Sequence, residues 1–581
     1  MKKIILSGVV FIALAVSIYF VYAIFIVNDD KVDLFNDEAN NIVIEADLIE
    51  GNSNSIIEKD QIMINVDFAK KHIDPYILWD SVEKKVTVTT SEKVIRMKIG
   101  ELQAFVNNKP VKINSATKEI KGKAYVHFDF LKDFYNIKYE YIKENNVIVI
   151  DFIDKDEQYG KIIEDEAFIR KGMSKRQPIV KTLKGNILKD KVKIFKEYKK
   201  WYKVRAEDGS VGYIDKKFVK KEKKITNKSN DKKDKTQSDE SKEKISIAWH
   251  AIYNNSKDIP VNKKIDGLDI LSPTWFEVKD SNGNLNVRAN KEYVDSAHSK
   301  GYKIWALLAN NFKDKESTHK LLSSTNARET LISELLIYSS MYSLDGINVD
   351  FENVFSEDKN NLSQLMREMT PILREQGLKV SIDVNLAEVY DRKELSETVD
   401  YLVLMAYDQH WKNGGKVGSV SQYKWVDSLL DGLIKNEKIS SDKIVLGIPF
   451  YTRNWSVSNK NGYESLIDSE AFSMEKSMEI VEKNKAKIKW DKESAQFYSQ
   501  YSKNGLTFKM WLEEQNSINW KSSLVHKYNL VGTAAWKINF EVDPVWDVLY
   551  KNLKIIKNYK EWEEKNSDNI YELVITKKYS N

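Results

Sequence analysis

The chain has 581 residues, of which 42% are hydrophobic and 30% charged, a composition that fits a globular protein of about two to four domains. The absence of cysteine excludes disulfides, thiol nucleophiles and cysteine-type zinc sites. The formal net charge is only +5 and lysines are mixed with acids throughout, so no nucleic-acid partner is expected.

The N-terminus carries an uncharged apolar segment, residues 4–27, between "MKK" and "NDD". This run is long enough to cross a membrane as a helix, and the lysines before it predict that the rest of the chain lies outside the cell. The alternative is a signal peptide that is cleaved after Ala23, which would release a secreted protein lacking residues 1–23. Because the apolar run continues past Ala23, we expect residues 1–27 to form a single-pass anchor in the cell membrane.

Residues 40–153 contain a weak internal repeat. "IMINVDFAKKHIDPYILWDSVEKKVTV" lines up with "AYVHFDFLKDFYNIKYEYIKENNVIVI", and each copy predicts strand, short helix, strand, turn and strand. The pattern resembles the repeat domain named after the N-terminal part of copper amine oxidases. His72 and His127 stand alone, without a cluster of metal-binding residues, so no copper site is expected.

Residues 166–222 form a second small β unit, in which "KKWYKVRAEDGSVGYIDKKFV" predicts two strands joined by an Asp208–Gly209 turn. This segment resembles the bacterial Src-homology-3-type domain, a module that often binds cell-wall peptides. The alternative is a spacer whose Trp201 and Tyr213 only form its core. Residues 223–244 are almost free of apolar side chains and predict a disordered linker.

From Ile245 the chain alternates short apolar strands with amphipathic helices. Eight strands over roughly 310 residues match the number and size of a (β/α)₈ TIM barrel, an α/β fold, here expected over residues 245–560. A long interval between the seventh and eighth strands predicts a small α+β insertion at about 456–530. The predicted strands are "ISIAWHAIY", "LDILSPTWFEV", "YKIWALLAN", "LDGINVDFEN", "LKVSIDVN", "YLVLMAYDQHW", "KIVLGIPFYTRNW" and "GTAAWKINF".

The fourth of these strands, "LDGINVDFEN", has polar side chains at every second position: Asn348, Asp350 and Glu352. Side chains alternate between the two faces of a strand, so these three are expected to point into the barrel and the apolar residues between them toward the helices. Barrel chemistry is carried by the C-terminal ends of the strands. Glu352 is therefore expected at the mouth of the barrel, one step above Asp350.

"DGINVDFE" resembles the signature of glycoside hydrolase family 18, the chitinase-like enzymes, with the pattern Asp-x-x-Asp-x-Asp-x-Glu. "SPTWFEVKDSNGNL", "MAYDQHW", "GIPFYTRNW" and "AAWKI" fit the same family. The motifs "SPTWF", "DFEN" and "YDQHW" resemble most its bacterial cell-wall and spore branch. The resemblance implies an O-glycosyl hydrolase that uses the substrate's own 2-acetamido group in place of a second carboxylate.

The resemblance also implies roles for individual residues. Glu352 would be the general acid and then the base, Asp350 would hold the acetamido N–H, and Tyr407 would donate to the acetamido oxygen. Asp345 and Asn348 would have supporting roles. Asn348 stands where the family often has Asp, which we expect to leave Asp350 less perturbed. The expected substrate-binding residues are Met405, Asp408, Gln409, Trp536, Trp275 and Asn310, with no metal and no cofactor.

The resemblance and the expected anchor together predict a substrate. The expected partner is a polysaccharide that contains N-acetylglucosamine, in the first place peptidoglycan, with chitin oligomers as a second candidate. Two alternatives remain open: a chitinase or endo-N-acetylglucosaminidase that acts on other glycans, and a non-catalytic protein that binds cell-wall glycan.

Overall fold

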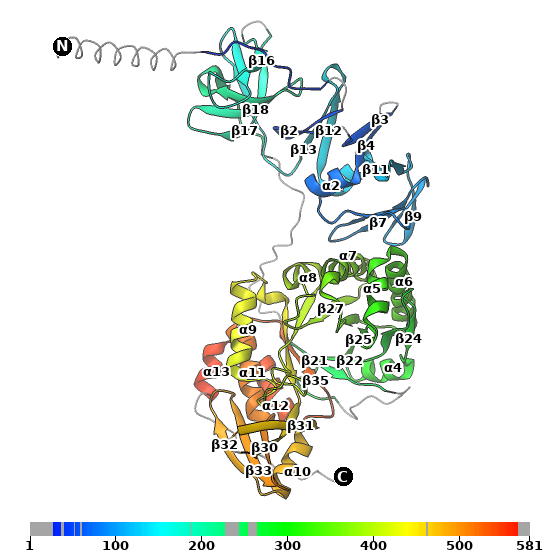
Figure 1. The fold of residues 1–581 in the computed structure, drawn as a ribbon, viewed down its shortest axis with the longest axis vertical. Coiled ribbons are helices and arrows are strands. Elements are labelled where there is room, and N and C mark those ends of the chain that lie inside the picture. Colours follow the sequence, from blue (N-terminus) through cyan, green and yellow to red (C-terminus); the bar gives the residue numbers. More distant parts are fainter. Residues whose placement is uncertain are drawn as a thin grey trace, which may run out of the picture. The chain divides into compact units, whose positions relative to one another are not determined.

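The computed structural model describes residues 27–36, 40–51, 53–58, 61–185, 188–226, 243–253, 264–460 and 463–566. The chain divides into two compact units, and the second contains every strand from β21 onward (Figure 1). Over the described ranges, no helix combines the length and apolar character that a membrane span requires. The predicted anchor lies outside these ranges except for Val27, as does most of the predicted linker.

The two copies of the N-terminal repeat have the predicted order of elements. Their first strands, β4 and β11, pair antiparallel with Met63 opposite His127 and so lie in one sheet, whereas the later strands of the two copies belong to two other sheets. The first copy is β4 (Gln61–Asn65), α2 (Val66–His72), β5 (Leu78–Asp80) and β6 (Lys85–Thr89). The second copy is β11 (Lys123–His127), α3 (Phe128–Tyr135), β12 (Ile137–Ile142) and β13 (Val147–Phe152). The other strands here are β1 (Asn41–Ile44), β2 (Asp47–Ile49), β3 (Ser55–Glu58), β7 (Val94–Lys98), β8 (Gln103–Val106), β9 (Lys109–Lys112) and β10 (Lys118–Ile120).

The next module is one sheet with the strand order β16-β15-β19-β18-β17-β14-β20. The predicted hairpin is present, since β18 pairs antiparallel with β19 across the turn at Gly209. The strands are β14 (Gln158–Ile162), β15 (Ala167–Arg170), β16 (Ile179–Leu183), β17 (Lys191–Glu197), β18 (Trp201–Ala206), β19 (Val211–Asp215) and β20 (Val219–Lys221).

A buried ion pair joins this module to the repeat. The Arg205 guanidinium on β18 donates to both carboxylate oxygens of Asp151 on β13, at 2.9 and 2.7 Å, and both side chains are less than 10% exposed. Burial by itself would raise the pKa of Asp151, but the hydrogen bonds and charges of Arg205 and Lys193 together outweigh it, so the pKa lies below its usual value. The bidentate geometry ties the two modules together within the N-terminal unit.

The C-terminal unit is a closed barrel of eight parallel strands, in the order β22-β21-β35-β29-β28-β27-β26-β25, with β25 pairing back to β22. All eight predicted strands are present and the expected TIM barrel is confirmed. The strands are β21 (Ile245–His250), β22 (Ile270–Pro273), β25 (Lys303–Ala309), β26 (Gly346–Asp350), β27 (Lys379–Val384), β28 (Tyr401–Met405), β29 (Ile444–Pro449) and β35 (Gly532–Trp536).

Amphipathic helices cover the outside of the barrel. In α7 the side chains of Leu362, Leu365, Met366 and Met369 recur at helical spacing and are all buried, which places one apolar stripe against the strands. The helices are α4 (Lys291–Ser299), α5 (Lys315–Ser323), α6 (Thr325–Tyr342), α7 (Lys359–Glu375), α8 (Arg392–Thr398), α9 (Tyr423–Lys435), α11 (Gln515–Lys527), α12 (Pro544–Tyr550) and α13 (Tyr559–Asn566). A short hairpin, β23 (Phe276–Val278) and β24 (Leu285–Val287), follows β22.

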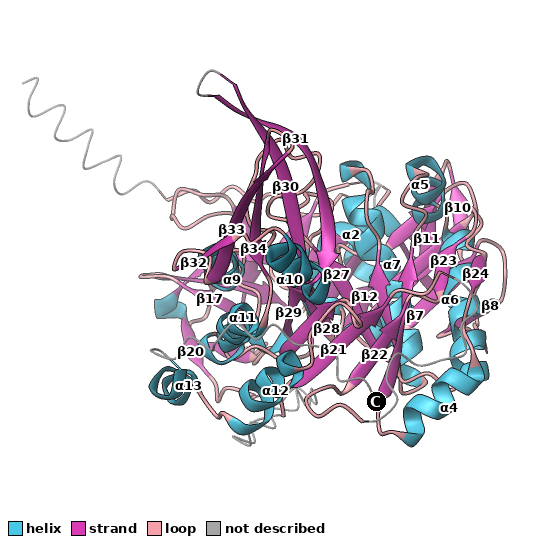
Figure 2. Ribbon diagram, turned by 90° about the horizontal axis from the view of Figure 1, so that it is seen from below, coloured by secondary structure: helices cyan, strands magenta, loops and turns pink. Residues whose placement is uncertain are grey.

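The insertion between β29 and β35 is a five-stranded antiparallel sheet with one helix, in the order β31-β30-β34-β33-β32. It occupies residues 451–512, so it begins earlier than predicted, and the end of the predicted range is the barrel helix α11. In Figure 2, β30 and β31 form a long hairpin that extends away from the barrel strands. The elements are β30 (Tyr451–Lys460), β31 (Tyr463–Ser473), α10 (Met474–Lys483), β32 (Lys487–Asp491), β33 (Gln496–Lys503) and β34 (Leu506–Leu512).

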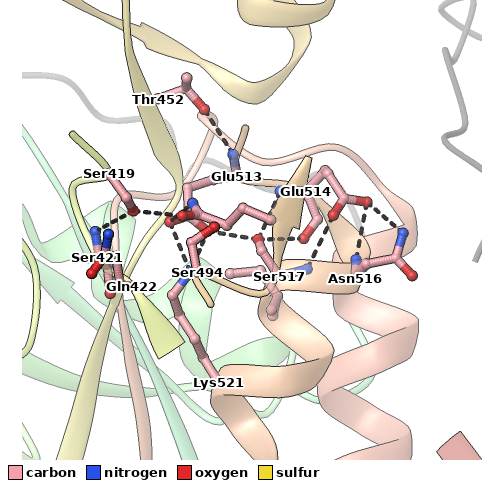
Figure 3. Close-up of polar contacts among 12 residues, drawn as sticks. Ser419, Ser421, Gln422, Thr452, Ser494, Glu513, Glu514, Asn516, Ser517 and Lys521 are labelled. Atoms are coloured by element: carbon pink, nitrogen blue, oxygen red, sulfur yellow. Dashed lines mark hydrogen bonds and ion pairs between the residues drawn. The ribbon is translucent and has the colours of Figure 1, made fainter. Parts of the chain in front are cut away.

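A buried polar network fastens the insertion to the barrel (Figure 3). At its centre the Glu513 carboxylate, just after β34, accepts from the Lys521 ammonium on α11 at 2.8 Å, and both side chains are at most 1% exposed. Glu513 also accepts from Gln496 on β33 at 2.8 Å, and its backbone N–H donates to Thr452 on β30. Gln496 in turn accepts from Ser419, which lies in the loop after β28.

We expect Lys521→Met to destabilise the C-terminal unit by about 3–5 kcal/mol, because it leaves the Glu513 carboxylate buried without its cation. Urea unfolding followed by tryptophan fluorescence measures the change. The control is Lys435→Met, which removes an exposed pair with Asp431 on α9 and should cost less than about 0.5 kcal/mol. Equal effects of the two substitutions would contradict the role given to Lys521.

Candidate active site

The side chains of β26 alternate as predicted. Ile347, Val349 and Phe351 belong to the apolar core between strands and helices. Asn348 and Asp350 point the other way, into the barrel, where Asn348 contacts side chains of β21, β22 and β27. The strand ends at Asp350, and Glu352 follows at the mouth of the barrel.

Asn310 fixes the backbone of Glu352. Its side-chain oxygen accepts from the Glu352 N–H at 2.9 Å, and its amide N–H donates to the Glu352 carbonyl oxygen at 2.9 Å. Asn310 follows the end of β25 and is only 2% exposed. It therefore supports the backbone of Glu352 and does not face the cavity, contrary to the prediction that it binds substrate. The two hydrogen bonds place Glu352 on a rigid element.

A cavity of about 380 Å³ opens above Asp350 at the C-terminal ends of the barrel strands. It combines four carboxyl groups with an apolar floor and with side chains from the insertion. Its lining residues are Trp249, Phe312, Asp350, Glu352, Asp383, Asn385, Met405, Tyr407, Asp408, Tyr451, Arg453, Ala471, Trp536 and Phe540.

Glu352 is set up to be a proton donor. Burial raises the pKa of its carboxyl group, and the negative charge of Asp408 raises this pKa further. Asp408 is itself held by the Tyr451 O–H, which donates to its carboxylate. A carboxylic acid whose pKa is raised toward neutrality can give a proton to a leaving group and then take one from water.

Asp350 is strongly perturbed even though Asn348 carries no charge. Burial, followed by the charges of Asp383 and Glu352, raises the pKa of Asp350 well above its usual value. The prediction considered only position 348 and overlooked Asp383, which the neighbouring strand β27 brings to the same place. Asp383 therefore supplies a negative charge beside Asp350 although position 348 is neutral.

Tyrosine and tryptophan side chains complete the cavity. Burial, with neighbouring negative charges, raises the pKa of Tyr407 well above its usual value, so its O–H remains a hydrogen-bond donor. Trp536, at the end of β35, lies with its ring centroid 5.9 Å from that of Trp249. These two indoles give the cavity an apolar side of the kind that stacks on a sugar ring.

Several predicted residues lie elsewhere. Trp275 is fully buried against Tyr293 with ring centroids 4.9 Å apart, so it belongs to the core and the prediction that it contacts substrate is wrong. Gln409 is hydrogen-bonded to Gln422 within the loop that follows β28 and is not among the lining residues. Asp345 accepts from the backbone N–H of Ile304 at the opposite end of β26, which agrees with a supporting role.

Asp383, Arg453 and Tyr451 also line the cavity, although they were not predicted from the sequence. Asp383 is an acidic residue within the apolar strand "VSIDVN". Asp350 was recognised from the same pattern, so Asp383 could have been found in the same way. Tyr451 and Arg453 alternate along the strand that leaves the barrel, and only the folding back of the insertion brings them to the cavity. Arg453 is the only cationic side chain among the described residues that line it.

Comparisons with known proteins agree with this architecture. Residues 275–541 match the family described as Glycosyl hydrolases family 18. Residues 43–150 match the copper amine oxidase N-terminal domain, and residues 165–220 match the bacterial SH3 domain. These matches confirm the three resemblances drawn from the sequence.

Similar proteins at low identity include bacterial ones. The "Uncharacterized glycosylase YvbX" of Bacillus subtilis is 26% identical over 47% of this chain and 82% of its own length. The "Cortical fragment-lytic enzyme" of the same organism is 24% identical over 41% of this chain and 56% of its own length. The crystal structure of the Bacillus cereus spore cortex-lytic enzyme SleL has a TM-score of 0.46 at 22% identity, covering 54% of this chain and 75% of SleL.

The Asp408 charge should be visible in the titration of Glu352. We expect Asp408→Asn to lower the pKa of the Glu352 carboxyl group, because the substitution removes the neighbouring negative charge that raises it. Carbon NMR of carboxyl-labelled glutamate, with Glu352 assigned by its loss in Glu352→Gln, measures the shift. The control Asp431→Asn on α9 should leave this pKa unchanged, and an unchanged pKa in Asp408→Asn would refute the assignment.

Proposed function

Because residues 275–541 form a Glycosyl hydrolases family 18 domain and the protein is a glycosidase, we propose that it cleaves β-1,4 bonds that follow N-acetylglucosamine, with Glu352 as its general acid. The observation that carries this assignment is the position of Glu352: its carboxyl group lines the cavity, its backbone is clamped by Asn310 and its pKa is raised. In the proposed reaction Glu352 protonates the glycosidic oxygen as the bond to the anomeric carbon breaks.

The nucleophile in this scheme comes from the substrate. The carbonyl oxygen of the 2-acetamido group attacks the anomeric carbon and forms an oxazolinium-like intermediate. Glu352, now ionised, takes a proton from water, and the water oxygen opens the intermediate with overall retention of configuration. Asp350 accepts a hydrogen bond from the acetamido N–H and stabilises its developing positive charge, while the Tyr407 O–H donates to the acetamido oxygen.

Peptidoglycan is the substrate that we propose. Three observations support it: a relative named as a cortical fragment-lytic enzyme, the bacterial SH3 module, and the apolar N-terminal segment of the sequence. On this proposal residues 1–27 anchor the protein in the cell membrane, with the catalytic domain on the cell-wall side.

Chitin and other glycans that contain N-acetylglucosamine form the alternative substrate class. Glu352, Asp350 and Tyr407 would contact only the N-acetylglucosamine unit, which all of these glycans share. A glycan-binding protein without activity is the alternative from another class. The raised pKa of Glu352 argues against it, since binding alone needs no proton donor.

We expect Glu352→Gln to reduce the rate of hydrolysis by about 10²–10⁴-fold, because glutamine has the same shape but no proton to donate. The chain from residue 28 onward is incubated with peptidoglycan and separately with chitin oligomers. Mass spectrometry after borohydride reduction then identifies the new reducing ends. The control Glu388→Gln, an exposed residue after β27, should retain full activity.

The outcomes separate the candidates. New N-acetylglucosamine reducing ends from peptidoglycan that are absent with Glu352→Gln would support the peptidoglycan proposal. Products from chitin oligomers alone would contradict it and favour the chitinase alternative. The absence of new ends from both substrates would refute a glucosaminidase on these glycans and favour the binding protein.

A further inference from the structure

Asp383 lies beside Asp350 at the bottom of the cavity. In the parallel pairing of β26 with β27, Asn348 is opposite Ser381 and Val349 is opposite Ile382, so Asp350 and Asp383 are the next residues on the two strands. Both line the cavity and are 8% and 1% exposed, respectively. The two carboxyl groups therefore share one buried site on the inner face of the barrel.

Hydrogen bonds distinguish the oxygens of these two groups. The amide N–H of Asn348 donates to Oδ1 of Asp383 at 2.8 Å, while the Asn348 oxygen accepts from the Trp249 indole N–H at 2.7 Å. Since the indole can only donate, the orientation of the Asn348 amide is fixed. Oδ1 of Asp383 is consequently an acceptor, and a proton on this group belongs on Oδ2.

Asp350, in contrast, has a carboxylate oxygen that lacks a hydrogen-bond donor. Its Oδ1 atom is buried, and no described residue donates a hydrogen bond to it. A buried carboxylate oxygen without a donor is costly, and two adjacent buried carboxylates without a cation are more costly still. A single proton placed between Asp350 and Asp383 would remove both costs, since it supplies a donor and cancels one charge.

Charges from the surrounding elements act in the same direction. Burial, and then the charge of Glu352, raises the pKa of Asp383 well above its usual value, although the hydrogen bond from Asn348 opposes this. The titratable and charged groups of the cavity, taken from every element around it, are Asp350, Glu352, Tyr407, Asp408, Tyr451 and Arg453, with Tyr390 packed close by.

We propose that Asp383 is a positioning residue that retains a proton on Oδ2 and donates it in a hydrogen bond to Asp350, so that Asp350 offers the sugar an ionised oxygen. The inference rests on the proposed function, in which that oxygen accepts the acetamido N–H. Asp383 acts through Asp350 and makes no contact with the sugar in this scheme. The chain thus carries an amide at 348 and an acid at 383, facing each other across two strands.

Two substitutions of Asp383 test this. Asparagine keeps the shape and donates permanently from its amide, so Asp383→Asn should retain kcat within about threefold near the pH optimum, whereas Asp383→Ala removes the donor and should lower kcat by about 10²-fold with little change in KM. Equal losses in both variants would show that ionised Asp383 is needed, and wild-type rates in Asp383→Ala would show that it has no role. Either result overturns the proposal.

The pH profile provides a readout that a structural role would not move. Wild-type activity should decline at alkaline pH as both Glu352 and Asp383 lose their protons, whereas Asp383→Asn should decline less steeply because one ionisation is gone. The exchange variant Asn348→Asp/Asp383→Asn restores one acid and one amide in reversed positions and should regain the steeper decline. An alkaline limb identical in all three proteins would contradict the proposal.

A measurement independent of activity separates this inference from the proposed function. A protonated carboxyl group has its own C=O stretching band in the infrared spectrum, and the band of Asp383 should be present at neutral pH and absent from Asp383→Asn. If the wild-type protein cleaves none of the glycans but the band is lost as expected, the proposed function fails and the protonation of Asp383 stands. An unchanged spectrum in Asp383→Asn refutes the proposal even for an active enzyme.

Discussion

The structure of the C-terminal barrel depends on hydrogen bonds among the polar side chains buried in its interior. Asn348 lies at the centre of the barrel and its amide is fully used: it accepts from Trp249 on β21 and Ser272 on β22, and donates to Ser381 and Asp383 on β27. An unpaired amide in this position would cost about 1–3 kcal/mol. The satisfied amide links four strands and fixes the arrangement of the carboxyl groups above it.

The solvent exposure of these carboxyl groups increases from the interior to the mouth of the barrel. Asp383 and Asp350 are almost inaccessible, Glu352 is partly exposed and Asp408 is exposed. Burial raises the pKa values of the inner three groups, and the negative charges of neighbouring carboxyl groups raise them further. A carboxyl group with a raised pKa beside an aromatic wall fits acid-catalysed cleavage of a glycosidic bond.

The insertion completes the cavity from above. Tyr451, Arg453 and Ala471 reach it from β30 and β31, and this placement relies on the Glu513–Lys521 pair that fastens the sheet to α11. The same network includes Ser419, in the loop that follows Asp408. A single buried cluster therefore holds both the insertion and the loop that carries Asp408, which links stability of the lobe to the geometry of the acid groups.

The sequence by itself determined the eight strands, the alternation of β26 and the position of Glu352 at a strand end, because these follow from local periodicity. Strand alternation also indicated Asp350, whereas Tyr407, Asp408 and Trp536 were indicated by the family resemblance, and all four line the cavity. Only the tertiary structure decided that Trp275 is core, that Asn310 grips the Glu352 backbone, and that Asp383 and Arg453 belong to the cavity. These depend on contacts between separate segments of the chain, such as the one between Asn310 and Glu352, and pairing of separate strands leaves no periodic trace in either segment alone.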